Sequence, residues 1–200
     1  MEQATKGLKL KGYTIAQFLS PHRYTGKTGE VSATFRRAGQ PAELDYRSGN
    51  AVHYLATGAT TEGRFGLYRW DFSTQPSGPS PHFHRTISES FFILSGTVRL
   101  YDGKDWVDAT AGDFSYVPEG GIHAFRNESG KEASMLILFA PGAPREEYFE
   151  TLARFAGNPD VTEAERAEIA LRHDNIWILR ELRGAASEQL SGGGPPGRPA

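Results

Sequence analysis

The sequence of 200 residues contains no cysteine. This absence excludes disulfides, zinc fingers, iron–sulfur clusters and catalysis by a thiol. Any bound metal must therefore be held by histidine, aspartate or glutamate. Such a ligand set suits iron, manganese, nickel, cobalt or zinc and does not distinguish among them.

The chain also lacks a strong net charge and a long hydrophobic run. It has 22 Lys and Arg against 24 Asp and Glu, a net charge of −2, which favours neither nucleic acid nor an anionic membrane surface as a partner. No apolar run reaches the roughly 18 residues that a membrane helix needs. The first residues contain scattered charges and no apolar core of secretory length. We therefore expect a cytoplasmic protein that binds neither membrane nor nucleic acid.

Turn-forming and aromatic residues are abundant. The chain has 23 glycines and 12 prolines, and 12% of its residues are aromatic. Between residues 52 and 140, short apolar or alternating runs are separated by turn residues every 8 to 12 positions or so, as in an antiparallel sandwich or barrel. One such run, Gly66–Phe72, places Tyr68, Trp70 and Phe72 on one face. The sequence thus predicts an all-β core.

The chain is longer than one domain of this kind requires, since a domain takes about 150 residues. We expect the surplus to flank the barrel rather than to form a second domain. The predicted segments are an N-terminal arm (1–50), the barrel (51–143), a C-terminal helical extension (144–190) and a flexible tail (191–200).

Helical periodicity begins after the predicted barrel. Arg145–Ala156 carries Tyr148, Phe149, Leu152 and Phe155 on one stripe, which predicts an amphipathic helix. A second helix should begin at Thr162, because the glutamate three residues later completes a capping box, and should end near position 173.

Four side chains are candidate metal ligands. His82 and His84 are two residues apart, so on a strand they point to the same face. Glu89 opens the next strand, and His123 lies in a turn that leads into another. Three imidazoles and one carboxylate suit a single divalent ion with one or two positions left open for water, dioxygen or substrate.

The spacing of these residues resembles the two motifs of the cupin superfamily. The first reads His82-x-His84-x4-Glu89-x6-Gly96, and the second reads Gly112-x5-Pro118-x-Gly120-x2-His123-x3-Asn127. One departure is Pro76, which stands where the family has a glycine, and we expect Gly78 to make that turn instead. The resemblance covers about residues 67–139.

The resemblance implies a double-stranded β-helix, a jelly-roll barrel with the metal inside. It carries the four ligand positions onto His82, His84, Glu89 and His123, and it makes Asn127 a structural residue that ties a strand end. Some cupins use only the three histidines, which would leave the glutamate free as a catalytic base. Glu89 is therefore both a candidate ligand and the candidate catalytic residue.

Side chains of the same strand parity as the ligands should point inward with them. We expect these to wall an aromatic and apolar substrate pocket: Phe91, Ile93, Phe125, Met135 and Ile137. Plain core packing is the alternative for each of these residues. The segment from Pro141-Gly142 through Glu146–Glu150 is similar to one in quercetin 2,3-dioxygenase-like cupins. That resemblance implies a dioxygenase that cleaves a flavonol, catechol or diketone-type small molecule.

Two other functions remain open on the sequence. The same ligands could serve a metal-dependent isomerase or cyclase of a small polyketide or sugar, without dioxygen. The domain could also bind a small molecule without catalysis, because fold and metal site do not fix the substrate. A homodimer is expected, since jelly-roll sheets have edges and the N-terminal arm could cover one.

Overall fold

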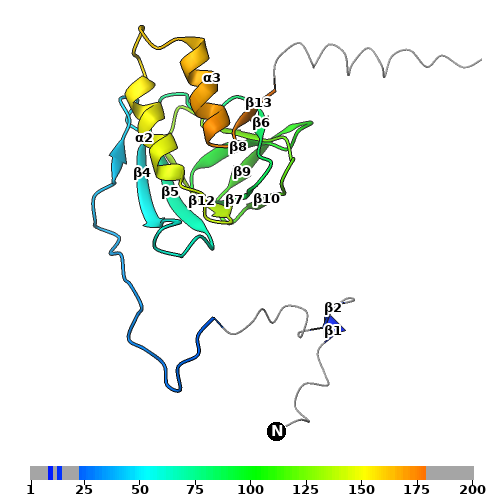
Figure 1. Ribbon diagram of the computed structural model, residues 1–200. Coiled ribbons are helices and arrows are strands. Elements are labelled where there is room, and N and C mark those ends of the chain that lie inside the picture. Colours follow the sequence, from blue (N-terminus) through cyan, green and yellow to red (C-terminus); the bar gives the residue numbers. More distant parts are fainter. Residues whose placement is uncertain (1–8, 11–12, 15–22, 179–200) are drawn as a thin grey trace, which may run out of the picture. The chain divides into compact units, whose positions relative to one another are not determined.

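Figure 1 shows the computed structural model, which describes residues 9–10, 13–14 and 23–178. The chain divides into two units, Met1–Arg37 and Ala38–Ala200. In the first unit, β1 (Lys9–Leu10) pairs with β2 (Tyr13–Thr14) in antiparallel fashion. The second unit holds the remaining elements and the candidate site. The predicted tail, 191–200, lies outside the described residues.

The larger sheet of the second unit has six antiparallel strands. Its order is β10 (Phe114–Val117), β7 (Ser88–Ser95), β12 (Ala133–Ala140), β5 (Gly66–Phe72), β4 (Ala51–Ala56) and β3 (Leu44–Asp45). The first strand of this sheet in the chain, β3, lies within the segment predicted as an N-terminal arm. Two residues are too short a run to show the alternation that identifies a strand.

Two smaller sheets complete the barrel. One has the order β11 (Ala124–Arg126), β8 (Thr97–Tyr101) and β9 (Trp106–Thr110), and the other pairs β13 (Ile176–Trp177) with β6 (His82–Phe83). All of their pairings are antiparallel. Together the sheets form the predicted all-β core, a double-stranded β-helix, and two helices lie between β12 and β13 in the chain.

Strict alternation on β5 and β12 builds the hydrophobic interior. In β5, Tyr68, Trp70 and Phe72 are buried, as predicted, and the residues between them are half-buried. In β12, Met135 and Ile137 are buried and pair in register with Trp70 and Tyr68. Each such side chain contributes about 1.5–3 kcal/mol when fully buried. This core fixes the strands that carry the candidate ligands.

Tight turns bring the ligand-bearing segments together. Gly78 adopts φ +147, and a Cβ there would clash with the carbonyl oxygen of Phe125, so the predicted turn glycine has a steric cause. Asn127 ties the neighbouring loops: its Nδ2 donates to the carbonyl oxygens of Ser73 (2.9 Å) and Lys131 (2.7 Å). The structural role predicted for Asn127 is confirmed.

Two helices lie together at one end of the barrel, next to β13 and β6 (Figure 1). The first, α2 (Arg145–Phe155), buries Tyr148 and Phe149 against the core. The second, α3 (Glu163–Arg172), begins with both hydrogen bonds of the predicted capping box between Thr162 and Glu165. Both helices are confirmed. In the described part of the chain, no helix is long and apolar enough to cross a membrane.

Candidate metal centre

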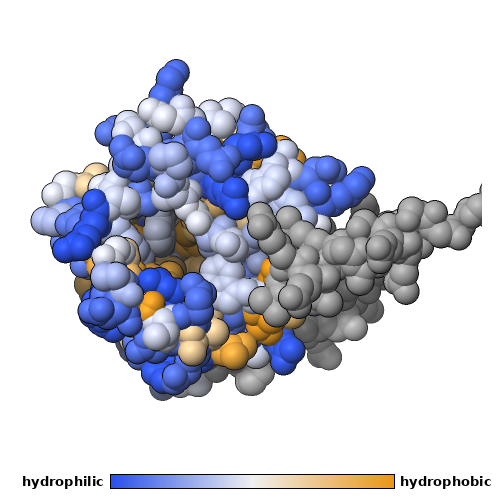
Figure 2. Space-filling view, turned by 90° about the horizontal axis from the view of Figure 1, so that it is seen from above, coloured by the Kyte–Doolittle hydropathy of each residue, from blue (hydrophilic) through white to orange (hydrophobic). Residues whose placement is uncertain are grey.

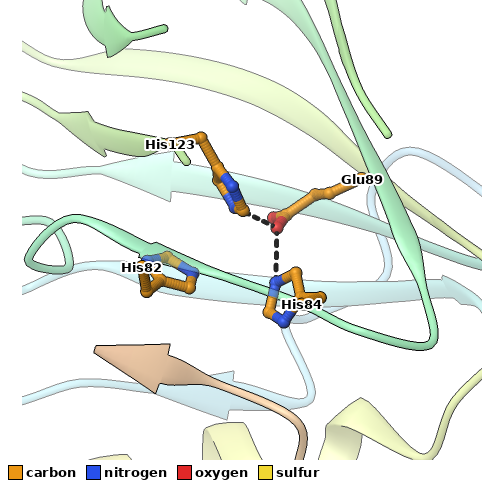
Figure 3. Close-up of side chains that lie close together, drawn as sticks. All are labelled: His82, His84, Glu89 and His123. Atoms are coloured by element: carbon orange, nitrogen blue, oxygen red, sulfur yellow. Dashed lines mark hydrogen bonds and ion pairs between the residues drawn. The ribbon is translucent and has the colours of Figure 1, made fainter. Parts of the chain in front are cut away.

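The four predicted ligands converge inside the barrel. One ligand atom from each of His82, His84, Glu89 and His123 lies within 4.8 Å of the others, and all four residues are buried. Figure 3 shows the Glu89 carboxylate between the rings of His84 and His123, with His82 facing the same space. The Oε2 atom of Glu89 lies 3.0 Å from Nε2 of His84 and 2.8 Å from Nε2 of His123. One short stretch, 82–89, and the distant His123 thus supply one compact donor set.

Backbone pairing places the rings. His82 and His123 exchange two main-chain hydrogen bonds of 3.0 and 2.9 Å, so both side chains project from one bridge. Glu89 sits on β7, where Val117 of β10 is its partner on one side and Phe139 of β12 its partner on the other. The carboxylate therefore comes from the start of a strand that is paired on both sides, which limits its freedom to move away from the imidazoles.

Each imidazole is oriented by a main-chain carbonyl group. The Nδ1 atoms of His82, His84 and His123 lie 2.9, 2.6 and 2.9 Å from carbonyl oxygens. The acceptors belong to Ser80, Asp174 and Gly121 respectively. Because a carbonyl only accepts, each Nδ1 must carry the proton, and in a neutral ring the Nε2 lone pair then faces the cluster. Metal-binding histidines show this arrangement.

The donor set fits a cation. A carboxylate oxygen and two unprotonated Nε2 atoms repel one another at 2.8 to 3.0 Å unless a proton or a metal ion lies between them. A proton on an Nε2 atom would also remove this repulsion, but only some of the Nε2 atoms can carry one. A single divalent ion would accept lone pairs from all three rings and from the carboxylate. The buried cluster therefore fits one metal ion, whose identity the ligands do not determine.

The charges of the metal-free cluster follow from burial and proximity. Burial opposes ionisation of Glu89, but His123 and His84 outweigh it and hold the glutamate pKa below its usual range. Burial, followed by the proximity of His123, lowers the pKa of His82 to about 3. Burial also disfavours a charged His123, yet the Glu89 carboxylate raises its pKa overall.

The segment after α3 contacts two of the candidate ligands. The sequence did not predict these contacts. The carbonyl oxygen of Asp174 accepts the His84 bond, while its carboxylate accepts bonds of 2.9 and 2.7 Å from the amides of Arg85 and Thr86. Trp177 pairs with His82 in register, and the two rings lie 5.5 Å apart. A left-handed Asp174 (φ +57) after a helix end is a weak sequence signal, and nothing in the pattern joins it to His84.

A cavity of about 380 Å³ opens beside the cluster. Seen from the helical end, the molecule is hollowed, with a mostly hydrophilic rim and hydrophobic residues deeper inside (Figure 2). His82 and Glu89 lie in the cavity wall together with Arg145. Eight aromatic residues line it: Tyr46, Trp70, Phe72, Phe125, Phe139, Tyr148, Phe149 and Trp177. This volume and lining suit a small planar molecule.

The predicted pocket residues divide into two groups. Phe125 and Ile137 line the cavity. Phe91, Ile93 and Met135 point inward as expected, but they are buried in the core and do not belong to the cavity lining. Strand parity predicts which face is inside and carries no information on depth along the barrel. The cavity-lining residues that the sequence did not predict come largely from β5 and α2.

Comparison with known proteins agrees with this fold and site. Residues 69–139, which include all four clustered side chains, match the cupin domain family. This segment of the chain is therefore a cupin domain. Its cupin domain ends before α2, so the helices and β13 are additions to the matched segment.

Individual relatives match only in part. Quercetin 2,3-dioxygenase of Bacillus subtilis is 27% identical over 115 residues, which are 56% of this chain and 32% of that protein. An uncharacterised protein of Aquifex aeolicus is 34% identical over 62 residues, 30% of this chain and 50% of that protein. An RmlC-like cupin from Shewanella frigidimarina shares 21% identity and a TM-score of 0.48, covering 58% of this chain and 96% of that one. The aligned cupin region therefore spans a third to a half of the curated relatives' length.

Proposed function

We propose that this cupin is a metal-dependent oxygenase that acts on a small planar molecule with an enolic or phenolic hydroxyl group. The observation that carries the proposal is the donor set of His82, His84, Glu89 and His123, two members of which, His82 and Glu89, lie in the wall of an aromatic cavity. The partial similarity to a quercetin 2,3-dioxygenase supports the reaction class. Flavonols, catechols and diketones are the substrates to test first.

Different residues of the site serve metal binding, substrate binding and proton transfer. The three imidazoles would hold a divalent ion, which supplies a Lewis-acidic position for substrate oxygen and dioxygen. Trp70, Phe139 and Trp177, which line the cavity, would contact a planar substrate and exclude water from it. Glu89 Oε2 accepts the proton of the substrate hydroxyl, which raises the electron density of the ring or enol. Dioxygen is then the oxidant, and both of its oxygen atoms enter the products.

The proposal is tested by metal analysis followed by assays of oxygen uptake. Protein purified without chelator should contain about one metal ion per chain and consume oxygen with at least one compound of the panel. Turnover under strictly anaerobic conditions would instead indicate the isomerase or cyclase. Absence of stoichiometric metal would contradict both enzymatic functions and leave a non-catalytic binding domain.

The role of Glu89 as a base can be separated from its role as a ligand. We expect Glu89→Gln to lower the turnover rate by a factor of about 10² to 10⁴, the usual contribution of a general base, and to lower metal content much less. Glu132→Gln is the matched control, because Glu132 is exposed and lies outside the cluster. Equal losses of metal and activity would show that Glu89 is a ligand first.

We also propose that the protein forms a homodimer through the outer face of β7 and β10. Phe92 and Phe114, which are paired in register, are 39% and 64% exposed, and Tyr116 beside them is 59% exposed. Because β10 is an edge strand, a second copy could cover both the apolar side chains and the open edge. Sedimentation should give a dimer for the wild type and a monomer for Phe114→Ser. A monomeric wild type would contradict the proposal.

A further inference from the structure

A buried arginine lies in the cavity wall and belongs to no part of the metal cluster. Arg145 opens α2 and is only 2% exposed. Its guanidinium lies over the rings of Phe139 and Tyr148, with its central carbon 4.7 and 4.6 Å from the two ring centres. It donates two hydrogen bonds, to the carbonyl oxygen of His173 (2.6 Å) and to Oδ1 of Asn175 (2.8 Å). Both acceptors are neutral.

The positive charge of Arg145 is not balanced by a carboxylate within salt-bridge distance in residues 23–178. The acidic groups nearby are otherwise engaged, and Glu89, whose charge acts on Arg145 through space, contacts His84 and His123 instead. Glu146 accepts a hydrogen bond from Tyr68 (2.6 Å), and Glu147 extends toward His173 at 3.9 Å. The carboxylate of Asp174 accepts main-chain bonds instead. Burial lowers the pKa of Arg145, but a guanidinium stays charged at neutral pH.

The cavity also has hydrogen-bond donors without acceptors. A guanidinium has five N–H groups, of which Arg145 uses two. Its Nε and the Nε1 of Trp70 are buried and have no partner among the described residues, and both residues line the cavity. A buried unpaired donor or charge costs several kcal/mol, so an acceptor from a ligand would recover part of that cost.

The overall charge of the cavity is positive once the metal site is filled. Glu89 is the only acidic residue in the lining; it forms no ion pair with Arg145, and its single negative charge equals the positive charge of Arg145 in size. A divalent ion then adds two positive charges that no residue of the lining neutralises. Aromatic walls keep the local dielectric low, which strengthens the attraction for an anion.

We propose that the cavity binds its substrate as an anion, a planar aromatic or conjugated molecule with an anionic oxygen, and that Arg145 determines this specificity. The proposal rests on the proposed function, since it assigns a substrate class to the same cavity. The anionic oxygen can belong to a carboxylate or to an enol or phenol whose proton has passed to Glu89 or to solvent. Arg145 faces it from α2, and the metal cluster faces it from the barrel.

The first experiment compares ligands of one shape and different charge. Binding of 1-hydroxy-2-naphthoate and 1-hydroxy-2-naphthamide to the metal-loaded protein is measured by calorimetry without oxygen. We expect the acid to bind tighter than the amide by a factor of about ten or more, as for a buried charge pair. Equal affinities would overturn the proposal. This comparison requires no substitution, so a folding defect cannot affect it.

A third ligand distinguishes the two sources of the anionic oxygen. The compound 4-nitro-1-naphthol carries no carboxylate and is ionised in mildly alkaline buffer. Affinity comparable with that of the acid identifies an ionised enol or phenol as a sufficient ligand. Affinity comparable with that of the amide identifies the carboxylate, which can accept two bonds from a guanidinium. Both results support an anion site.

Variants separate the contribution of Arg145 from that of the metal. Arg145→Gln removes the charge but keeps an amide donor, and it should reduce the acid-to-amide affinity ratio by a factor of about ten while the metal remains. Arg145→Lys should retain most of the ratio. Arg172→Met is the matched control, because Arg172 is an exposed arginine on α3. An unchanged ratio in a folded Arg145→Gln protein would overturn the proposal.

The result is separable from that of the oxygenase assay. A strong preference for the acid with no oxygen uptake would leave the anion site in place and contradict the oxygenase. Oxygen uptake with neutral compounds and no preference for the acid would support the oxygenase and overturn the role of Arg145.

Discussion

Asp174 offers the sharpest test of how the metal site is supported. One end of this residue holds a candidate ligand, since its carbonyl oxygen accepts the bond from His84 Nδ1 at 2.6 Å. The other end anchors the chain, since its carboxylate accepts bonds from the amides of Arg85 and Thr86 and from the Thr86 hydroxyl (2.7 Å). We expect Asp174→Gly to free the segment and so to loosen the orientation of His84.

The magnitude follows from the bonds that are lost. Three hydrogen bonds to a carboxylate would contribute several kcal/mol if fully buried, but Asp174 is half-buried, so about 2 kcal/mol is realistic. Loss of a group that orients a metal ligand lowers metal affinity by about 10- to 100-fold, which corresponds to roughly 1.4 to 2.8 kcal/mol. Glycine is the appropriate substitution because Asp174 has φ +57, where alanine would add backbone strain.

The assay is competition for metal with a chromogenic chelator, together with thermal unfolding of the metal-free protein. Asp174→Asn should behave nearly as the wild type, since asparagine tolerates the same backbone conformation and keeps one acceptor oxygen. Asp102→Gly is the matched control, because Asp102 accepts two main-chain bonds (2.8 and 2.7 Å) in the distant β8–β9 turn. If Asp174→Gly and Asp102→Gly bound metal equally well, the reasoning on His84 would be refuted.

Three further variants test the metal site and the fold that supports it. The double variant His84→Ala/His123→Ala should lose its metal and keep a β-rich circular dichroism spectrum, and normal metal content would contradict the ligand assignment. Gly78→Ala should lower the free energy of unfolding in urea by about 2–4 kcal/mol, because the new Cβ would clash with the Phe125 carbonyl at φ +147, and a change below the error of the measurement would argue against that turn. Thr162→Ala should cost about 1 kcal/mol through loss of the α3 cap, measured in the same way, and no loss would mean that the cap does not contribute.

The features that could be predicted from the sequence are those that depend on residues close together in the chain. His82, His84 and Glu89 belong to one eight-residue stretch, so their convergence needs little more than a strand and a turn. Only His123 depends on a longer connection, and the second family motif supplied it. Likewise the capping box at Thr162 needs only a residue three positions away. Features with such local causes were predicted correctly.

Features that depend on depth inside the barrel or on long-range strand pairing could not be predicted from the sequence. Strand parity correctly placed Phe91 and Met135 inside the barrel. These side chains pack in the hydrophobic core, however, and the cavity lies nearer α2. The two-residue strands β6 and β13 carry too little alternation to be recognised, and their pairing joins residues 82–83 to 176–177. No periodicity links such distant segments.

The candidate metal ligands and part of the cavity wall come from different parts of the chain, and this limits what the family match can say about function. The ligand cluster belongs wholly to the segment that matches the cupin domain family, 69–139. Arg145, Tyr148 and Trp177, which shape the cavity, follow that segment. The family match therefore supports a metal site, but it says little about which molecule is bound, because part of the cavity wall lies outside the matched segment. Substrate specificity should change with α2 and β13 even where the histidines and the glutamate stay the same.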